Sequence, residues 1–288
     1  MPGLAALADR YDGFILDLWG TIHDGIRAWP GAVACMAELK RREKRVLVLS
    51  NAPRRSRFAI KRMDEMAIPR AGYDDVLTSG EAANRALLLR NDDWHRRLGR
   101  RCHLLGPPGH LDDSVLEEVP HERVEDLANA EFIVNVGVRR RTDRLSDYES
   151  FLREGTERKL PMICCNPDYE VLRGGDRELC AGALARRYGE LGGDVRYHGK
   201  PHAPIYAESM KRLGLSDPAR VLAIGDALRT DVAGAAAAGM DAVLITSTGI
   251  LAMELGIAPY EDPDPAMLAR LCAAEGQHPL AAIAAFRW

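Results

Sequence analysis

The fold is decided by the stretch FILDLWGT, which occupies residues 14–21. A short apolar run delivers an aspartate, Asp17, and a Gly-Thr turn follows it. A run that is apolar without alternation is typical of a strand buried on both faces of a parallel sheet. Ligands of open α/β sheets bind beyond the carboxyl ends of the strands, so Asp17 stands where function usually lies. An aspartate that only caps the next turn would leave the same pattern.

Short apolar runs of the same kind recur along the chain, and segments with helical spacing of apolar residues lie between them. The runs cover residues 45–51, 76–80, 101–106, 132–137, 161–166, 220–226 and 242–247. The helical segments cover residues 31–42, 81–89, 148–153, 181–191, 203–213 and 230–238. This alternation predicts an α/β chain with right-handed crossovers.

Composition limits the kinds of partner. The 288 residues carry 39 Lys and Arg against 42 Asp and Glu, a formal net charge of −3, so no basic excess points to nucleic acid or a membrane surface. The most apolar long stretch, residues 232–253, has Asp241 in its middle, which favours buried helix and strand over a membrane span. The N-terminal residues lack the pattern of a secretory signal.

The six cysteines form no C-x-x-C pair and have no zinc-ligand spacing with a histidine. In a chain of this length they do not indicate a disulfide framework. We therefore expect a reducing compartment, the cytoplasm, and cysteines that serve as small apolar packing residues.

Two further segments place polar groups where strands are expected to end. The run VLVLSNAPR, residues 46–54, ends in Ser50 and Asn51, whose hydroxyl and amides suit phosphate oxygens. Ser and Asn also begin helices as N-caps, so this segment is ambiguous alone. In HGKP, residues 198–201, Lys200 precedes a proline and offers a point charge for a phosphate. A surface lysine is the plainer interpretation.

The stretch VLAIGDALRTD, residues 221–231, ends an apolar run in Gly-Asp and adds a second acid five residues later. Asp226 and Asp231 around a tight loop form a hard-oxygen site of the kind that suits Mg²⁺. Asp231 is alternatively a first-turn acid that the helix dipole favours.

The order of these segments is more specific than any one of them. Strand-Asp17, strand-Ser50, Gly-Lys200-Pro and Gly-Asp226-x4-Asp231 resemble the four motifs of the haloacid dehalogenase-like hydrolase superfamily. The resemblance covers nearly the whole chain.

The long interval between Ser50 and Lys200 resembles subclass IIA, the NagD-like and 4-nitrophenylphosphatase-like group, which inserts a large α/β cap there. Asn166-Pro167-Asp168 and Ser79-Gly80-Glu81 fit that group as well. The resemblance implies a Rossmann-like doubly wound parallel-sheet core from residues 1–80 and 196–288. It implies an inserted α/β cap domain, which sets substrate specificity, from residues 81–195.

The resemblance also implies roles. Asp17 would be the nucleophile that forms an aspartyl-phosphate, which water then hydrolyses. Mg²⁺ would be held by Asp17, the backbone carbonyl of Trp19, Asp226 and Asp231. Ser50, the amide of Asn51 and Lys200 would bind the phosphoryl oxygens, and Lys200 would also separate Asp17 from Asp226 electrostatically.

One residue departs from the family pattern. The family has a second aspartate, the general acid/base, two residues after the nucleophile, and this chain has Trp19 there. A backbone carbonyl still suits a metal, but indole is neither acid nor base at neutral pH. His23, Asp24 and His198 are candidate substitutes for the proton transfer, and each has an ordinary structural role as its alternative.

Three residues are candidates for substrate contact. Asn166 and Asp168 would shape the cap loop, although Asn-Pro-Asp is also a strong turn former. Arg54 follows the Ser-Asn pair and would contact an anionic substrate, or else lie exposed at a helix start.

The sequence therefore predicts a Mg²⁺-dependent phosphatase that hydrolyses a small phosphomonoester such as a sugar phosphate or nucleotide. The alternatives are a phosphate- or metabolite-binding protein with little turnover, and a phosphotransferase to an acceptor other than water. A dehalogenase fits poorly, because Ser50, Lys200 and the two late acids suit phosphate and Mg²⁺. The expected partner is a small phosphorylated metabolite, not nucleic acid or a membrane, and a homodimer stays open.

Overall fold

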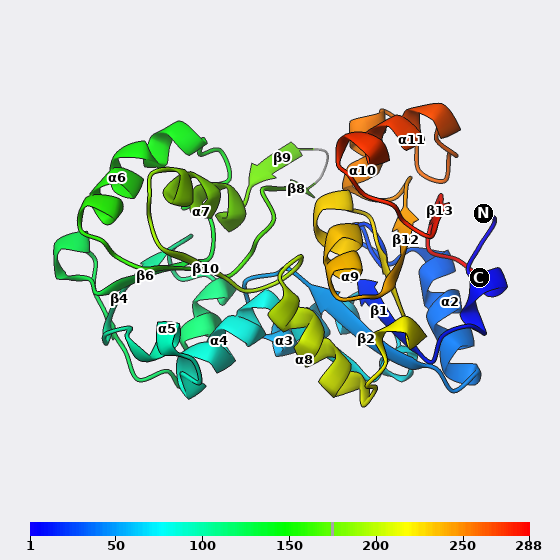
Figure 1. Ribbon diagram of the computed structural model, residues 1–288, viewed down its shortest axis with the longest axis horizontal. Coiled ribbons are helices and arrows are strands. Elements are labelled where there is room, and N and C mark those ends of the chain that lie inside the picture. The colour runs from blue at the N-terminus through cyan, green and yellow to red at the C-terminus, as the bar shows by residue number, and fades with distance from the viewer. Residues whose placement is uncertain (174–175) are drawn as a thin grey trace. The chain divides into compact units, whose positions relative to one another are not determined.

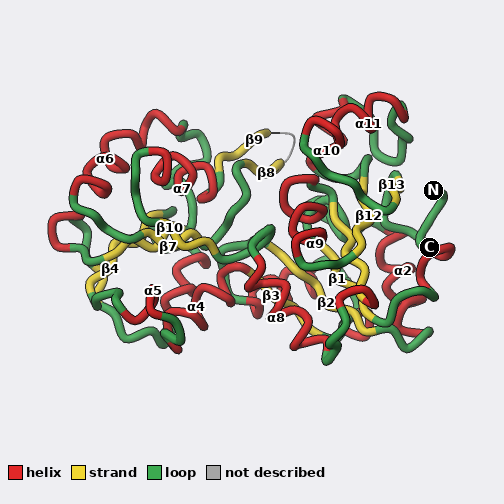
Figure 2. Tube along the Cα trace, viewed as in Figure 1, coloured by secondary structure: helices red, strands yellow, loops and turns green. Residues whose placement is uncertain are grey.

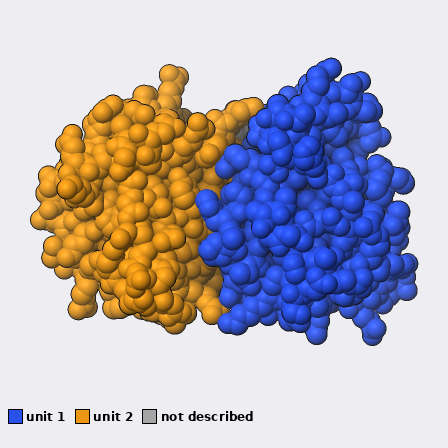
Figure 3. Space-filling view, viewed as in Figure 1, with its two compact units in different colours: residues 1–50, 60–77, 200–288 blue, residues 51–59, 78–199 orange. Residues whose placement is uncertain are grey.

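The computed structural model describes residues 1–173 and 176–288, which form two compact units (Figure 3). Unit 1 comprises residues 1–50, 60–77 and 200–288, and unit 2 comprises residues 51–59 and 78–199. The predicted ranges, 1–80 with 196–288 for a core and 81–195 for a cap, stay a prediction. Unit 2 differs from the predicted cap in that it also contains the short segment 51–59.

Unit 1 is built on a six-stranded sheet with the order β13-β12-β11-β1-β2-β3. Its strands are β1 (Gly13–Asp17), β2 (Arg45–Ser50), β3 (Asp75–Thr78), β11 (Val221–Gly225), β12 (Asp241–Ile245) and β13 (Ala281–Ile283). Neighbours from β13 to β2 run parallel. Starting at β1, the chain adds β2 and β3 on one side, then β11, β12 and β13 on the other. The sheet is therefore doubly wound, with the order reversing between β1 and β11.

The helices of unit 1 lie along this sheet in Figure 1, and Figure 2 separates helices, strands and loops by colour. They are α1 (Ala5–Ala8), α2 (Pro30–Arg41), α8 (Ala203–Leu213), α9 (Ala233–Ala237), α10 (Ile250–Leu255) and α11 (Pro265–Ala274). Helix α3 (Ser56–Glu65) begins in unit 2 and ends in unit 1. Both α2 and α8 pack against β2, whose residues after Arg45 are all buried.

Unit 2 has its own five-stranded sheet with the order β10-β7-β6-β4-β5, and a separate antiparallel hairpin. The sheet strands are β4 (Arg101–Leu105), β5 (Glu122–Arg123), β6 (Phe132–Asn135), β7 (Met162–Cys164) and β10 (Val195–Tyr197). The hairpin strands are β8 (Glu170–Arg173) and β9 (Asp176–Leu179). Every neighbouring pair of the five-stranded sheet is parallel, and the order reverses between β4 and β6.

Helices cover both faces of the sheet of unit 2 (Figure 1). On one face α4 (Ser79–Leu89) and α5 (Asp93–Arg96) pack with Trp94 and Phe132 in one apolar cluster. On the other face α6 (Glu149–Glu157) and α7 (Ala181–Glu190) pack with Ile133 in a second cluster. Alternate residues of β6 thus enter opposite cores, as the two-residue period of a strand requires.

The predicted fold class is confirmed, because both units are α/β with a parallel sheet. Several predicted runs extend past their strands. The run 132–137 contains β6 only to Asn135, and the run 76–80 contains β3 only to Thr78, because α4 begins at Ser79. The hydroxyl oxygen of Thr78 accepts a hydrogen bond from the backbone of Glu81 at 3.1 Å, which is a helix N-cap. Within the described residues, no helix combines the length and apolarity that crossing a bilayer requires.

Candidate active site

Three strand ends of unit 1 meet at the point where the strand order reverses. Asp17 is the last residue of β1 and pairs in register with Leu49, so Ser50 follows at the same edge. On its other side β1 pairs with β11, with Leu16 opposite Ile224, so that Asp226 comes just after the neighbouring strand end. Parallel pairing alone therefore brings Asp17, Ser50 and Asp226 to one edge of the sheet.

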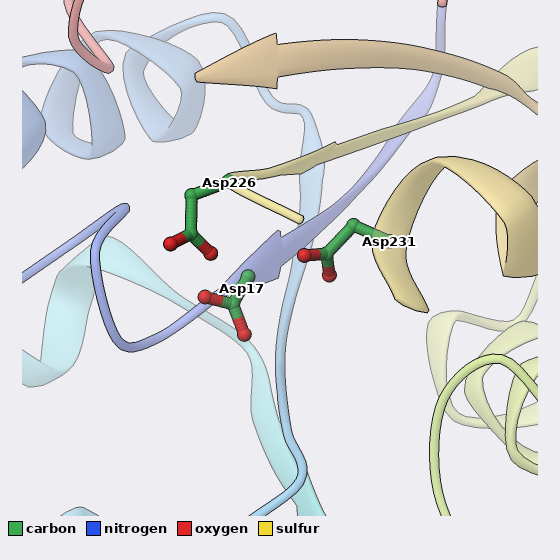
Figure 4. Close-up of side chains that lie close together, drawn as sticks. All are labelled: Asp17, Asp226 and Asp231. Carbon is green, nitrogen blue, oxygen red and sulfur yellow. The ribbon is translucent and has the colours of Figure 1, made fainter. Parts of the chain in front are cut away.

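The carboxyl groups of Asp17, Asp226 and Asp231 form one cluster (Figure 4). One oxygen from each lies within 4.8 Å of the others. Each residue is at least 93% buried, so water screens the three charges poorly. Asp231 reaches the cluster from a π-helical turn, Leu228–Val232, that precedes α9.

Lys200 neutralises part of this charge. Its Nζ donates to Asp17 Oδ1 at 2.5 Å and to Asp231 Oδ1 at 2.6 Å, and the lysine itself is 3% exposed. Burial raises the pKa of Asp17 well above its usual range, and the nearby carboxylates of Asp231 and Asp226 add to this effect, while Lys200 lowers that pKa. Three acids facing one ammonium leave the cluster short of positive charge.

Glycines allow the backbone to approach the two late acids closely. A Cβ on Gly249 would lie 1.8 Å from Asp226 Oδ2, and a Cβ on Gly225 would lie 2.1 Å from Asp231 Cγ. Gly20 has a φ of +78°, and a Cβ there would lie 2.4 Å from Asp226 Oδ2. Larger residues at these positions would displace the carboxyl groups.

Backbone and phenolic groups hold the loops in place. The Ile250 amide donates to Asp226 Oδ2 at 2.6 Å, and the Ala227 amide donates to Asp231 Oδ2 at 3.2 Å. The buried Tyr206 hydroxyl on α8 donates to the carbonyl of Thr230 at 3.2 Å. These contacts hold Asp226 and the turn that carries Asp231 in position.

The donor set fits a hard divalent cation. Mg²⁺ prefers carboxylate and carbonyl oxygens, and it is bound through a small number of protein carboxylates. A buried cluster with three acids and one base is costly unless a cation joins it. The residues present therefore suit Mg²⁺ by chemistry, charge and separation.

Trp19 lies in a tightly organised loop after β1. Its ring meets that of His23 edge-on with centroids 5.2 Å apart, and a Cβ on Gly25 would lie 2.4 Å from its Cζ3. His23 is 1% exposed, its Nδ1 accepts from the Gly25 amide, and burial lowers its pKa to about 4. Although burial opposes it, hydrogen bonds from Arg27 and Ile26 amides lower the pKa of Asp24.

Asn51, Asn166 and Asp168 come together in unit 2. The Asn51 amide group donates to Asp168 Oδ1 at 2.9 Å, and its Oδ1 accepts from the Ser79 hydroxyl at 3.0 Å. Asn166 Oδ1 accepts from the Asp168 amide at 3.0 Å, which is the turn that Asn-Pro-Asp favours. A Cβ on Gly199 would lie 2.5 Å from Asn51 Oδ1, so only glycine fits there.

The remaining candidates are engaged within unit 2. Arg54 Nε lies 3.0 Å from Asp112 Oδ1, a carboxylate that is almost fully buried. His198 Nε2 lies 3.2 Å from the Nε2 of His95, whose Nδ1 lies 2.9 Å from both oxygens of Asp92. The structure thus gives both Arg54 and His198 partners that their sequence neighbourhoods did not suggest.

Sequence reasoning missed the groups that support the acids. The amide of Ile250 is a backbone donor and carries no residue signature; only the preceding Gly249 hints at close approach. The Thr248 hydroxyl, which donates to the carbonyl of Gly20 at 2.5 Å, lies far along the chain in an apolar stretch. Ser79 belongs to the Ser-Gly-Glu motif, but nothing in that motif indicates its hydrogen bond to Asn51.

Three known proteins are similar to this chain over most of its length. A solved hydrolase of the haloacid dehalogenase-like family from Brucella suis 1330 is 32% identical, with 99% of each chain covered and a TM-score of 0.84. A solved 4-nitrophenylphosphatase from Thermotoga maritima is 25% identical, with 96% of this chain and 95% of that one covered and a TM-score of 0.68. A D-glycerol 3-phosphate phosphatase from Mycobacterium tuberculosis is 26% identical over 251 residues, which are 86% of this chain.

The chain spans 66% of the length of the mycobacterial relative. The family model described as haloacid dehalogenase-like hydrolase matches residues 11–239, which include Asp17, Ser50, Lys200, Asp226 and Asp231. The resemblance that the motif order predicted is confirmed: this chain belongs to the haloacid dehalogenase-like hydrolases.

Proposed function

We propose that this protein is a Mg²⁺-dependent phosphatase that hydrolyses small phosphomonoesters. The observation that carries the proposal is the buried cluster of Asp17, Asp226, Asp231 and Lys200 at the reversal point of the strand order. Relatives named as phosphatases of glycerol phosphate and nitrophenyl phosphate support the substrate class. A small phosphorylated metabolite is then the partner, and six cysteines that are all free in the structure suit a cytoplasmic location.

Asp17 is the proposed nucleophile. One of its oxygens forms a bond to phosphorus while the bond from phosphorus to the leaving oxygen breaks, which gives an aspartyl-phosphate. Water then attacks phosphorus, releases inorganic phosphate and restores the Asp17 carboxylate. Lys200 balances the charge of the phosphoryl oxygens, because its ammonium is already directed at Asp17.

The remaining unit 1 residues complete the proposed site. Asp17, Asp226, Asp231 and the carbonyl of Trp19 would hold Mg²⁺, which supplies positive charge to the phosphoryl oxygens when bound. Ser50 would donate its hydroxyl to the same oxygens.

Substrate recognition would come from unit 2, which contains the predicted cap of residues 81–195. The Asn51 side chain is engaged with Asp168 and Ser79, so its phosphate contact would come from the backbone amide. Asn166 and Asp168 would shape the substrate loop. Arg54, which is held by its ion pair with Asp112, would contact an anionic substrate.

The indole of Trp19 leads to an expectation about which leaving groups react fastest. Indole donates no proton to a leaving oxygen at neutral pH, so substrates with stable leaving anions should react best. A positioned acid is worth about 10²–10⁴-fold in rate. Slow hydrolysis of the aspartyl-phosphate would also favour transfer to an added alcohol, the phosphotransferase alternative.

The test measures phosphate release from 4-nitrophenyl phosphate and glycerol 3-phosphate, with and without Mg²⁺. We expect repeated turnover that EDTA abolishes and that Asp17→Asn lowers by at least about 10³-fold. The matched control is Asp64→Asn, which removes an exposed aspartate paired with Arg70 in unit 1 and should leave the rate unchanged.

Three outcomes would contradict the proposal. Equal rates in Asp17→Asn and the wild type would exclude Asp17 as the nucleophile. Ligand-induced thermal stabilisation without phosphate release would indicate a binding protein. Phosphate that appears only on an added alcohol would indicate a phosphotransferase.

A further inference from the structure

The sheet of unit 2 has a reversal point of its own. Counted along the chain, its five parallel strands lie in the order 2-1-3-4-5, with β4 first and β5 second. In parallel sheets of this order, ligands bind outside the carboxyl ends of strands one and three. Those strands are β4 and β6, so topology alone predicts a ligand site at the loops that follow them.

The two loops begin in close contact. A Cβ on Gly106, just after β4, would lie 2.3 Å from Val136 Cγ2, just after β6. Gly137 follows with a φ of +145° and has no atom within 4 Å of where its Cβ would stand. The backbone after β6 is therefore free to line a cavity.

The segment after β6 lines a cavity of about 360 Å³. Its lining residues are Arg139, Arg140, Asp143, Asp147 and Tyr148. The volume falls within the range of small-molecule sites, about 300–1,000 Å³. The polar groups of the cavity come from one short stretch, residues 139–148.

A hydrogen-bond network fixes the backbone of this stretch. The Tyr148 hydroxyl accepts from the Arg139 amide at 2.5 Å and donates to Asp143 Oδ2 at 2.6 Å. The Arg140 amide donates to the same Asp143 oxygen at 3.0 Å. Asp147 Oδ2 accepts from the Arg144 amide at 2.8 Å. Burial raises the pKa of Tyr148 to about 12, so its hydroxyl keeps the proton that it donates.

The charged ends of the same side chains remain available. Both arginines are exposed, and in the part of the chain that the structure describes neither guanidinium pairs with an acid. The Arg139 guanidinium lies 5.6 Å from the ring centre of Phe151. Asp143 and Asp147 each keep Oδ1 without a hydrogen-bond partner among the described residues. Four arginines against two aspartates in residues 139–147 make the surroundings basic.

We propose that this cavity binds a small polyhydroxylated anion. Its phosphate or carboxylate group contacts the guanidinium groups of Arg139 and Arg140, and its hydroxyl groups donate to Asp143 and Asp147. Guanidinium is the side chain best matched to such planar or branched oxyanions, because it donates through a fork. The proposal does not depend on the phosphatase proposal, since binding here needs neither Mg²⁺ nor turnover.

The test is isothermal titration calorimetry of the full chain in EDTA. The probes are glycerol 3-phosphate, glycerate, inorganic phosphate and glycerol. We expect one of the two hydroxylated anions to bind best, and which one does identifies phosphate or carboxylate as the anionic group. Glycerol should give no heat, because it lacks the anion.

The decisive variant is Arg139→Ala with Arg140→Ala, which keeps both backbone amides and so keeps their contacts to Tyr148 and Asp143. We expect affinity to fall at least about 10-fold. The matched control is Arg153→Ala with Arg158→Ala, which removes the same charge from exposed positions on α6 and just after its end. The affinity of the variant with lysine at both positions should be intermediate. Lysine keeps the positive charge but cannot donate two parallel hydrogen bonds to one oxyanion.

A second variant tests the aspartates that accept hydrogen bonds from the ligand hydroxyl groups. Asp147→Asn keeps an oxygen for the Arg144 amide but weakens acceptance from a ligand hydroxyl. The preference for glycerol 3-phosphate over inorganic phosphate should fall about fivefold. Equal binding by the alanine pair and its control would overturn the proposal. Absence of binding by the wild type at millimolar probe would overturn it equally.

Discussion

The two units of this protein use one topological rule with opposite chemistry. In unit 1 the strand order reverses between β1 and β11, and three aspartates with one lysine are buried there. In unit 2 it reverses between β4 and β6, and exposed arginines line a cavity beside aspartates. Unit 1 presents buried acids that require a cation, whereas unit 2 presents exposed bases that can accept an anion. Topology thus locates a site, and burial with charge decides what it binds.

The largest expected effect comes from Lys200→Met, which removes the positive charge from the unit 1 cluster. Asp17 and Asp231 would lose their shared partner, and breaking a buried ion pair costs about 3–5 kcal/mol. We expect a drop of this size in the free energy of unfolding of the metal-free protein, measured by urea denaturation. Phosphatase activity should fall by about 10²–10³-fold.

Lys61→Met is the control for that experiment, because Lys61 is an exposed lysine of unit 1 on α3. Its unfolding curve should match the wild type. Mg²⁺ should stabilise the control through binding to the folded state. An unchanged unfolding curve for Lys200→Met would mean that the buried charges do not distinguish unit 1 from unit 2.

Trp19→Asp should have the next largest effect, because it supplies a carboxyl group where the chain has an indole. We expect the rate on alkyl phosphates to rise about 10²-fold and the rate on 4-nitrophenyl phosphate to change little. Steady-state kinetics on both substrates measures this difference.

Trp19→Phe is the matched control, since it keeps an aromatic ring against His23 and Gly25 and adds no acid. It should retain the leaving-group dependence of the wild type. If Trp19→Asp gave the same dependence as Trp19→Phe while remaining folded, proton transfer would not limit the reaction.

Gly20→Ala tests whether glycine is required beside Asp226. The new Cβ would lie 2.4 Å from Asp226 Oδ2, at a residue with a φ of +78°. We expect Mg²⁺ affinity, measured by titration calorimetry, to fall about 10-fold, because a 1.4 kcal/mol loss corresponds to that factor.

Gly109→Ala in unit 2 is the control for backbone strain. It places alanine at a positive φ but brings no Cβ against another residue. Its φ is +65°, and no atom lies within 4 Å of where its Cβ would stand. It should lower stability slightly and leave Mg²⁺ affinity unchanged. Equal losses of affinity in the two variants would assign the effect to strain.

The smallest effect is expected from Asn51→Ala, which removes the link from Asp168 to Ser79 within unit 2. Loss of these hydrogen bonds should cost about 1 kcal/mol locally. Hydrogen exchange should quicken in segment 51–59 and around Asp168 and stay unchanged around Asp17. Asn91→Ala, at an exposed position of unit 2, should change neither region.

Asp17 and Asp226 could be predicted because each lies at the end of an apolar run that is a buried strand. Asp17 ends β1 and Asp226 follows β11, and in both cases the apolar run gave the strand to within two residues. Parallel pairing then leaves little freedom in where their side chains go. Asp231 was open to two interpretations because a π-helical turn has no clear sequence signature.

The missed elements lack that signal. Strand β5 is two exposed residues, Glu122–Arg123, and β13 is only three residues long. Strands β8 and β9 are four residues each and carry mostly charged residues, so neither shows the apolar run that marks a buried strand. The cavity after β6 was missed because Arg139 and Arg140 look like an ordinary solvated face until the strand order of unit 2 is known.

The assignment of segment 51–59 to unit 2 has a consequence for recombination between relatives. The chain passes between units after residues 50, 59, 77 and 199, so unit 2 has four junctions instead of the two of a simple insertion. The Thr78 hydroxyl donates to the carbonyl of Arg54 at 2.6 Å, and Arg55 pairs with Glu81 at 2.7 Å. A graft of residues 78–199 alone would leave Thr78 and Glu81 without these partners. If unit 2 sets substrate preference, as we propose, its transfer from one relative to another requires that segments 51–59 and 78–199 move together.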